Sequence, residues 1–157
     1  MNRRNTLNKD EIYMQKAIEL AKIAEDNGDV PVGALIVVDG EIIATGYNKR
    51  ELDKNSLSHA EIIAINDACK RLGGWRLADA TLYVTLEPCP MCAGAIINSR
   101  IKRVVYGTKD VKAGAMGSVL NMNSYPLNHK VELTYPVCEQ KCTSLLTDFF
   151  SKLRSKN

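Results

Sequence analysis

The residues best suited to chemistry in this chain lie in two short segments, His59-Ala60-Glu61 and Pro88-Cys89-Pro90-Met91-Cys92. One imidazole and two thiolates are ligands that zinc prefers, and a site with three protein ligands keeps a fourth position open for water. Glu61 supplies a carboxylate that can take a proton from such a water and deliver it to a leaving group. The two segments therefore predict a catalytic zinc site with His59, Cys89 and Cys92 as ligands.

The elements around the cysteines are suited to hold a metal ion. Thr81–Leu86 is rich in β-branched and aromatic residues, which predicts a buried strand. Pro90 suits the first turn of a helix, where its missing N–H costs nothing. Cys89 is then expected near the helix N-cap and Cys92 in the first turn, where the helix dipole lowers the pKa of a thiol and favours the thiolate.

A second helix is expected to begin near His59, because an apolar face follows Glu61. Ser58 and Glu61 also match a capping box, so a purely structural role for Glu61 as a helix cap is an alternative. The pairing of this helix start with His59 and the cysteine segment favours the catalytic role.

Three further cysteines are expected in the core, because free cysteine behaves as a small buried hydrophobe. Cys69 lies on the predicted helix after Glu61, and Cys138 and Cys142 begin an apolar stripe that includes Phe149. A structural zinc site with Cys138 or Cys142 as a fourth ligand is the alternative, and it would leave Glu61 without a role.

The bulk composition predicts one domain, residues 1–157, with residues 1–7 as a flexible N-terminal segment. No apolar run approaches the ~20 residues of a membrane span, and no apolar signal-peptide core follows the basic N-terminus. Five cysteines, two of them expected metal ligands, favour the reducing cytoplasm. The net charge of +3 permits a nucleic-acid partner without indicating one.

The remaining pattern predicts an α/β fold with three αβα layers and a mixed five-stranded sheet. Asn8 with Glu11 opens a helix that ends near Gly28, and Asp39-Gly40 joins two strands in a hairpin. Further strands are expected at 103–107 and 130–135, a mostly irregular loop at 108–128, and a last helix at 137–154. Ligands are expected beyond the carboxyl ends of the strands, where both metal-bearing helices begin.

The H-x-E and P-C-x-x-C pattern matches the signature of zinc nucleobase deaminases, and the chain resembles the cytidine/deoxycytidylate deaminase superfamily. More narrowly, it is similar to the bacterial tRNA-specific adenosine deaminases. The resemblance rests on these segments: Val30-Pro31-Val32-Gly33-Ala34, Gly46-Tyr47-Asn48, His59-Ala60-Glu61, residues 80–89, 91–96, 99–101 and 103–107, Asn128-His129, and residues 145–150.

The resemblance implies a cytidine deaminase-like fold and hydrolytic conversion of adenosine to inosine at the wobble position of a tRNA anticodon. It also implies a homodimer with one Zn²⁺ per subunit. His59, Cys89 and Cys92 would hold the metal, and Glu61 would be the catalytic acid–base group. The anticodon stem-loop would be the partner. The residues expected to bind it are Asn48, Ala60, Asp110, Asn128, His129, Phe150 and Arg154.

The implied substrate contacts differ in kind. Asn48 would bind the flipped base, the Ala60 amide the base or a developing anion, and Asp110 a ribose 2′-hydroxyl. Asn128 and His129 match a family pair near the anticodon, and Phe150 and Arg154, four residues apart, would offer stacking and phosphate contacts. The alternatives are a turn role for Asn48 and solvated surface positions for Asp110 and His129.

Two other functions are compatible with the sequence. A free-base or nucleotide deaminase, such as a guanine deaminase, also carries a proline between the cysteines and would use its C-terminal segment to close the pocket. A non-catalytic zinc-binding RNA adaptor would tolerate Glu61→Ala, whereas a deaminase would lose activity and retain zinc.

Overall fold

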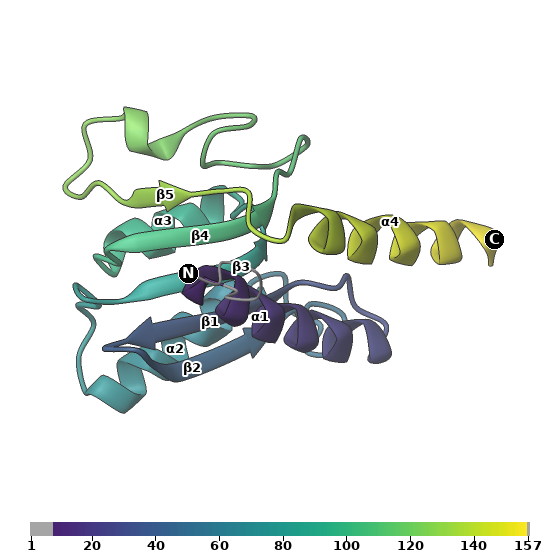
Figure 1. The fold of residues 1–157 in the computed structure, drawn as a ribbon, viewed down its shortest axis with the longest axis horizontal. Helices are drawn as coiled ribbons and strands as arrows, with labels where there is room; N and C mark the ends of the chain where they lie inside the picture. The colour runs from purple at the N-terminus through teal and green to yellow at the C-terminus, as the bar shows by residue number, and fades with distance from the viewer. Residues whose placement is uncertain (1–7, 157) are drawn as a thin grey trace, which may run out of the picture.

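A computed structural model describes residues 8–156, so the expected flexible segment 1–7 lies outside the described residues. A five-stranded sheet forms the middle layer, in the order β2-β1-β3-β4-β5 (Figure 1). The strands are β1 (Gly33–Val38), β2 (Glu41–Tyr47), β3 (Thr81–Leu86), β4 (Arg103–Thr108) and β5 (Glu132–Thr134). A single 3₁₀ turn, η1 (Met122–Ser124), interrupts the long irregular segment before β5.

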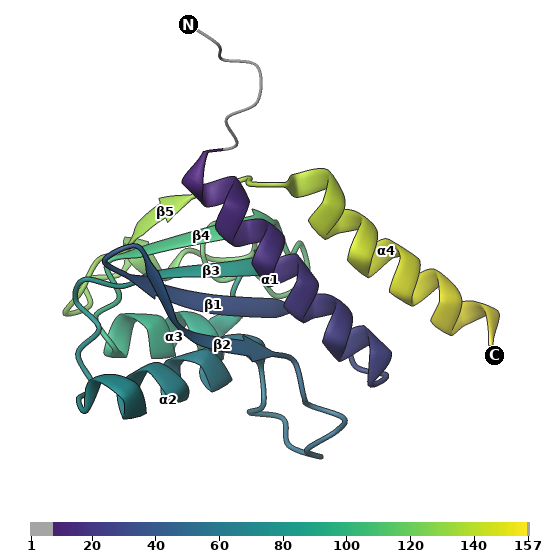
Figure 2. The same cartoon turned by 60° about the horizontal axis from the view of Figure 1, so that its bottom comes forward.

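Helices cover both faces of the sheet, which confirms the expected three layers (Figure 2). One face carries α1 (Lys9–Asp26) and α4 (Glu139–Ser155), and the other carries α2 (Ala60–Leu72) and α3 (Pro90–Asn98). The predicted N-cap of α1 is confirmed, since the Asn8 side chain accepts a hydrogen bond from the Glu11 amide. Each face of the sheet has its own apolar core, with Leu82 and Ile96 on the α2/α3 side and Leu35 and Val105 on the α1/α4 side.

Strand direction determines where the functional groups gather. β1 is antiparallel to both β2 and β3, and β3, β4 and β5 are parallel to one another. Strands β2, β3 and β4 therefore end at the same edge of the sheet. Asn48 follows β2, Glu87 follows β3 and Lys109 follows β4, so three loops from distant parts of the chain meet at that edge, as expected for open sheets with parallel strands.

The hairpin between β1 and β2 was correctly predicted from Asp39-Gly40. Both residues have positive φ, 50° and 77°, which is the conformation that a two-residue type I′ turn requires and that Asp and Gly tolerate best. This hairpin places β1 in the interior of the sheet, where residues 33–37 are all buried.

Helix α2 lies directly on β2, and Gly46 permits this close approach. A Cβ atom at Gly46 would overlap the carbonyl oxygen of Ala60 and lie 2.9 Å from the backbone nitrogen of Ala64. Since protein interiors are close-packed, a side chain at this position would push the first turn of α2 away from the sheet.

The three remaining cysteines differ in burial. Cys142 is 1% exposed and belongs to the α1/α4 core, as predicted. Cys69 and Cys138 are only half-buried, although both pack against a core. Phe149, on the predicted apolar stripe, is also only half-buried, because the second half of α4 extends beyond the strands (Figure 1).

Candidate active site

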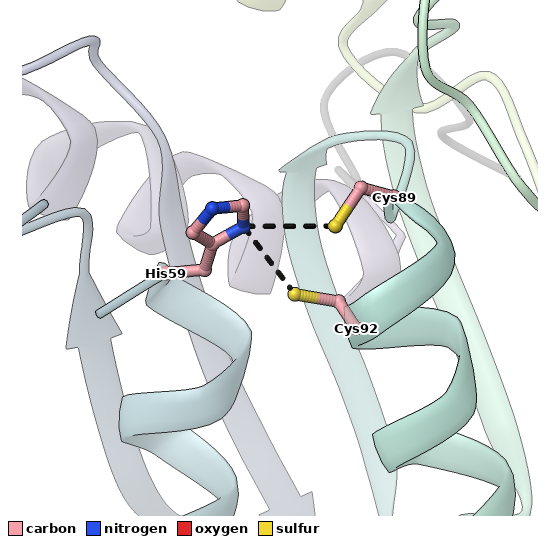
Figure 3. Close-up of side chains that lie close together, drawn as sticks. All are labelled: His59, Cys89 and Cys92. Carbon is pink, nitrogen blue, oxygen red and sulfur yellow. Dashed lines mark hydrogen bonds between the residues drawn. The ribbon is translucent and has the colours of Figure 1, made fainter. Parts of the chain in front are cut away.

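Two helix starts bring the predicted metal ligands together. His59 is the N-cap of α2, Cys89 is the N-cap of α3, and Cys92 lies in the first turn of α3. The Nδ1 atom of His59 lies 3.7 Å from the Sγ atom of Cys89 and 3.6 Å from that of Cys92 (Figure 3). All three donor atoms lie within 4.8 Å of one another, so His59 forms one cluster with two cysteines that are 30 and 33 positions away in the chain.

The donor atoms fit a zinc ion. With Zn–S bonds of about 2.3 Å and Zn–N bonds of about 2.0 Å, tetrahedral geometry separates the donors by roughly 3.5–3.8 Å. The observed N–S distances of 3.6 and 3.7 Å fall within that range. Within residues 8–156 this is the one such group of metal-ligating side chains, and Cys142 packs on the opposite side of the sheet. The alternative of a structural site completed by Cys138 or Cys142 is therefore wrong.

The ligands are partly prepared for a metal before it binds. A hydrogen bond from the Cys92 thiol, with further help from His59, lowers the pKa of Cys89 to about 4. The same bond to Cys89 raises the pKa of Cys92, and a hydrogen bond with Cys89 raises the pKa of His59. Because zinc binds thiolates, uptake of a zinc ion here would release the proton held by Cys92.

Glu61 lies in the first turn of α2 with only 4% of its surface exposed. Burial raises the pKa of its carboxyl group to about 7, so the group can both accept and release a proton near neutral pH. The alternative capping-box role is wrong, because the N-cap is His59 and the Ser58 hydroxyl donates instead to Asp53, at 2.9 Å. Helix α2 begins one residue later than a Ser58 cap requires. Glu61 is therefore not at the third helical position that a capping box needs.

A pocket opens beside the cluster at the carboxyl-end edge of the sheet. Its lining residues are Val30, Val32, Asn48, Arg50, His59, Ala60, Glu61, Leu86, Glu87, Cys89 and Asp110. The expected base-binding residue Asn48 is thus beside the metal ligands. Its Nδ2 donates to the Val30 carbonyl and its Oδ1 accepts from the Arg50 amide, which leaves one N–H and one lone pair of the side-chain amide for a ligand.

Ala60 and Asp110 also line this pocket, as predicted. Ala60 is the first residue of α2, where backbone N–H groups have no partner within the helix and point toward a ligand. Asp110 is not simply a solvated charge: its Oδ1 accepts the backbone N–H groups of Lys112 and Ala113 at 3.0 and 3.1 Å. The carboxylate thus caps the loop after β4, and the residue is part of the pocket wall.

The C-terminal and late-loop candidates do not line the pocket. Phe150 is 40% exposed and lies, with Phe149, in a neighbouring hollow that shares Val30, Asn48 and Arg50 with the pocket. Arg154 is exposed on the last turns of α4.

Asn128 and His129 lie elsewhere in the subunit. Asn128 lines a separate hollow against α3, next to Gly94. His129 is half-buried, and its Nε2 lies 2.7 Å from the Ile101 carbonyl oxygen. A single subunit therefore does not bring this pair to the pocket.

Two pocket residues, Glu87 and Arg50, were missed from the sequence. Glu87 is 2% exposed and binds backbone amides of the loop after β4. A third missed residue, Asp29, lies in the neighbouring hollow; it is 1% exposed and accepts the amides of Glu51 and Leu52. The sequence did offer one signal for Glu87, which is an acidic residue directly between a predicted buried strand and Pro88-Cys89. Its partners, 23 to 31 positions away, follow no periodic pattern.

Comparisons with known proteins agree with this geometry. A family model described as MafB19-like deaminase matches residues 8–154. A tRNA-specific adenosine deaminase of Bacillus subtilis is 50% identical over 151 residues, covering 96% of this chain and 94% of the relative. The tRNA-specific adenosine deaminase of Haemophilus influenzae is 46% identical, covering 94% and 86%.

Solved structures support the same grouping. One, from biochemical and structural studies of A-to-I editing by tRNA:A34 deaminases at the wobble position of transfer RNA, has a TM-score of 0.84 and 40% identity. That likeness covers 86% of this chain and 99% of the other. A guanine deaminase of Bacillus subtilis is less similar, with a TM-score of 0.61 and 34% identity over 78% of this chain and 88% of the other. None of the helices among the described residues is long and apolar enough to cross a membrane. From the matched family model, these relatives and the shared fold, the chain belongs to the MafB19-like deaminase family and, within it, to the tRNA-specific adenosine deaminases.

Proposed function

We propose that this protein hydrolyses adenosine to inosine at the wobble position of a tRNA anticodon. His59, Cys89 and Cys92 would hold one zinc ion per subunit, and Glu61 is the acid–base group. The proposal is supported by the relatives and by a pocket that unites the metal ligands, the buried carboxylate and Asn48.

Glu61 carries the proton transfers of the reaction. A zinc ion held by the three ligands would lower the pKa of a bound water to about 7, far below its value in bulk water. The Glu61 carboxylate takes one proton of the attacking water and delivers it to N1 of adenine as the C6–O bond forms. It then takes the remaining proton of that water, now on the C6 hydroxyl, and transfers it to the exocyclic nitrogen. The C6–N bond breaks, and ammonia leaves. Adenosine and water thus give inosine and ammonia.

The other pocket residues orient the base. The free N–H and lone pair of the Asn48 side chain match the mixed donor and acceptor pattern of a purine edge. The backbone N–H groups at the start of α2, including that of Ala60, are placed to donate to atoms that gain negative charge in the reaction.

The position of α4 is the observation that favours a tRNA over a free base as the substrate. No described residue of α4 lines the pocket, and the helix instead borders the neighbouring hollow through Phe149, Phe150 and Leu153. A free-base enzyme is expected to close its pocket with the C-terminal segment. Here the pocket stays open, and an aromatic surface lies next to it where neighbouring bases of an anticodon loop can stack.

The finer substrate contacts remain part of this proposal. Asp110 would accept a hydrogen bond from the ribose 2′-hydroxyl of the target nucleotide, since it lines the pocket. Phe150 would stack on a flanking base, and Arg154, one turn further along α4, would bind phosphate.

We also propose a homodimer in the cytoplasm. Gly94 and Ala95 are only half-buried on α3, and the exposed Leu127 lines the same hollow as Gly94, so this face is suited to helix packing between subunits. A dimer there would place the nearby Asn128 and His129 at a subunit boundary. Cytoplasmic location suits ligands that must stay reduced, and all five cysteines are free. Residues 1–157 would form one domain.

The test is deamination of an anticodon stem-loop by zinc-loaded protein, with Glu61→Gln as the matched variant of nearly equal size. We expect inosine only at the wobble adenosine and a rate loss between about 10² and 10⁴-fold in the variant, with zinc content unchanged. A stem-loop with the adenosine moved by one position is the control. Ammonia release from guanine with an inert stem-loop would instead indicate a free-base deaminase. Stem-loop binding without any deamination would indicate the RNA adaptor.

A further inference from the structure

Glu87 holds the loop after β4 through all of its acceptor positions. Its Oε1 accepts the Asp110 backbone N–H at 3.1 Å and the Ser118 hydroxyl, and its Oε2 accepts the backbone N–H groups of Met116 and Ser118 at 3.0 and 3.1 Å. A carboxylate offers about four lone-pair positions, so this buried side chain is fully used by one loop.

The loop is shaped around that carboxylate. A Cβ atom at Gly114 would overlap the Glu87 carboxylate, so the loop backbone lies against it at this point. Two backbone bonds fix the same contact from the strand side: the Glu87 amide donates to the Thr108 carbonyl, and the Ala115 amide donates to the Pro88 carbonyl, both at 2.9 Å.

Asp110 links the loop held by Glu87 to the pocket, because it bonds to Glu87 and also lines the pocket. Its backbone is held by Glu87, and its own Oδ1 is occupied by two loop amides. Rotation of the side chain is therefore restricted, and Oδ2, which has no hydrogen-bond partner within residues 8–156, is free to accept from a ligand in the pocket.

We propose that Glu87 is a positioning residue that acts through Asp110 and sets the preference for a ribose over a deoxyribose at the target nucleotide. The proposal deepens the function given above and rests on it. Glu87 would not touch the reacting atoms; its role is to keep the Asp110 carboxylate where a 2′-hydroxyl can donate to it.

Glu87→Gln tests this role selectively. The new amide group must face either the two backbone N–H groups at Oε2 or the pair at Oε1. The hydroxyl of Ser118 can turn from donor to acceptor, whereas a backbone N–H cannot, so the amide is expected at the Oε1 position. The bond lost is then the one to the Asp110 amide, and the other loop contacts remain.

The measurement compares kcat/KM for two anticodon stem-loops that differ only in ribose or 2′-deoxyribose at the wobble adenosine. We expect Glu87→Gln to reduce the ribose preference by about threefold to tenfold, the effect of one weakened hydrogen bond. Asp110→Asn, which keeps Oδ1, should reduce it as well. Combining the two should give little further change, because both act on one contact. An equal loss on both substrates, or additive effects, would overturn the proposal.

Two further variants separate positioning from general damage. Asp29→Asn alters the other buried carboxylate, which accepts the amides of Glu51 and Leu52 at 2.7 and 3.2 Å, and should leave the sugar preference unchanged. Gly114→Ala would place a Cβ atom against both the Glu87 carboxylate and the Asp110 carbonyl oxygen, so it should reduce the sugar preference at least as much as Glu87→Gln.

Amide hydrogen exchange provides a readout that needs no substrate. In Glu87→Gln the Asp110 amide should exchange faster while the zinc content stays that of the wild type. Unchanged exchange at the Asp110 amide would overturn the proposed role of Glu87, whatever the activity of the wild-type protein. Failure of the wild-type protein to deaminate any stem-loop would refute only the proposed function.

Discussion

Two regions around the pocket differ in burial and in what holds them in place. One is formed by the starts of α2 and α3, and the other is the rim, the outer surface beside the pocket. At the helix starts, three ligand atoms lie within 4.8 Å and Glu61 is 4% exposed. At the rim, the loop after β4 and the second half of α4 present exposed side chains, with Val111 79% and Phe150 40% exposed. The first region is fixed by helix geometry and core packing, whereas the second combines a loop held by hydrogen bonds with the exposed end of a helix.

This difference indicates where each part of the function resides. Bond making and breaking needs groups held to a fraction of an ångström, which helices packed on a sheet provide. Recognition of an RNA loop needs contacts spread over a wide surface, and loops on a rigid scaffold provide those. Changes in the first region should therefore affect metal and rate, and changes in the second should affect binding.

The largest effect is expected from Cys92→Ser, which removes one of the three proposed zinc ligands, a side chain that is completely buried. Zinc content should fall far below one per subunit, and deamination should fall to background, because two ligands hold the metal too weakly. Metal analysis together with the thermal unfolding midpoint would check this. Cys138→Ser, which alters a half-buried cysteine outside the cluster, is the control and should keep its zinc. Full zinc retention in Cys92→Ser would contradict the assigned ligand set.

A smaller effect, confined to binding, is expected from Phe150→Ala at the rim. Base stacking on an aromatic ring contributes about 1–3 kcal/mol, so KM for the stem-loop should rise roughly tenfold with kcat nearly unchanged. Steady-state kinetics would separate the two constants. Leu153→Ala, an exposed residue of the same hollow, is the matched control and should change KM less. A loss in kcat alone would break the distinction between the two regions.

The smallest effect on activity is expected from Asp10→Asn, because Asp10 lies in neither of the two regions. Asp10 accepts hydrogen bonds from Arg103 at 2.6 and 3.0 Å and from the Tyr83 hydroxyl at 2.7 Å. The Arg103 hydrogen bonds lower the pKa of Asp10. The stabilisation is therefore present above the ordinary pKa of 3.8 and is lost as the pH falls through the lowered value.

The variant should lose about 1–2 kcal/mol of stability at pH 7, and the difference should shrink toward zero in strong acid. Urea unfolding at several pH values would measure it, alongside unchanged kcat/KM. A cost that stays constant down to pH 2 would show that packing rather than the ion pair is responsible.

The features that the sequence predicts correctly are those set by local patterns, and the features that it misses depend on contacts between distant loops. The His59, Cys89 and Cys92 cluster, the hairpin turn and the N-cap of α1 were predicted because each motif involved consists of residues a few positions apart. Glu87 and Asp29 were missed because their partners are backbone amides of loops, 22 to 31 positions away. The capping box at Ser58 failed through a shift of one residue, which no local pattern fixes.

The absent side chain at Gly46 has a consequence for variation in this protein. Any substitution there would displace the first turn of α2, and with it the imidazole that must meet two sulfur atoms. A position that touches no substrate and binds no ion would therefore tolerate change as poorly as a metal ligand in a survey of random variants. In this chain, the coordination chemistry constrains a strand residue that has no functional group to contribute.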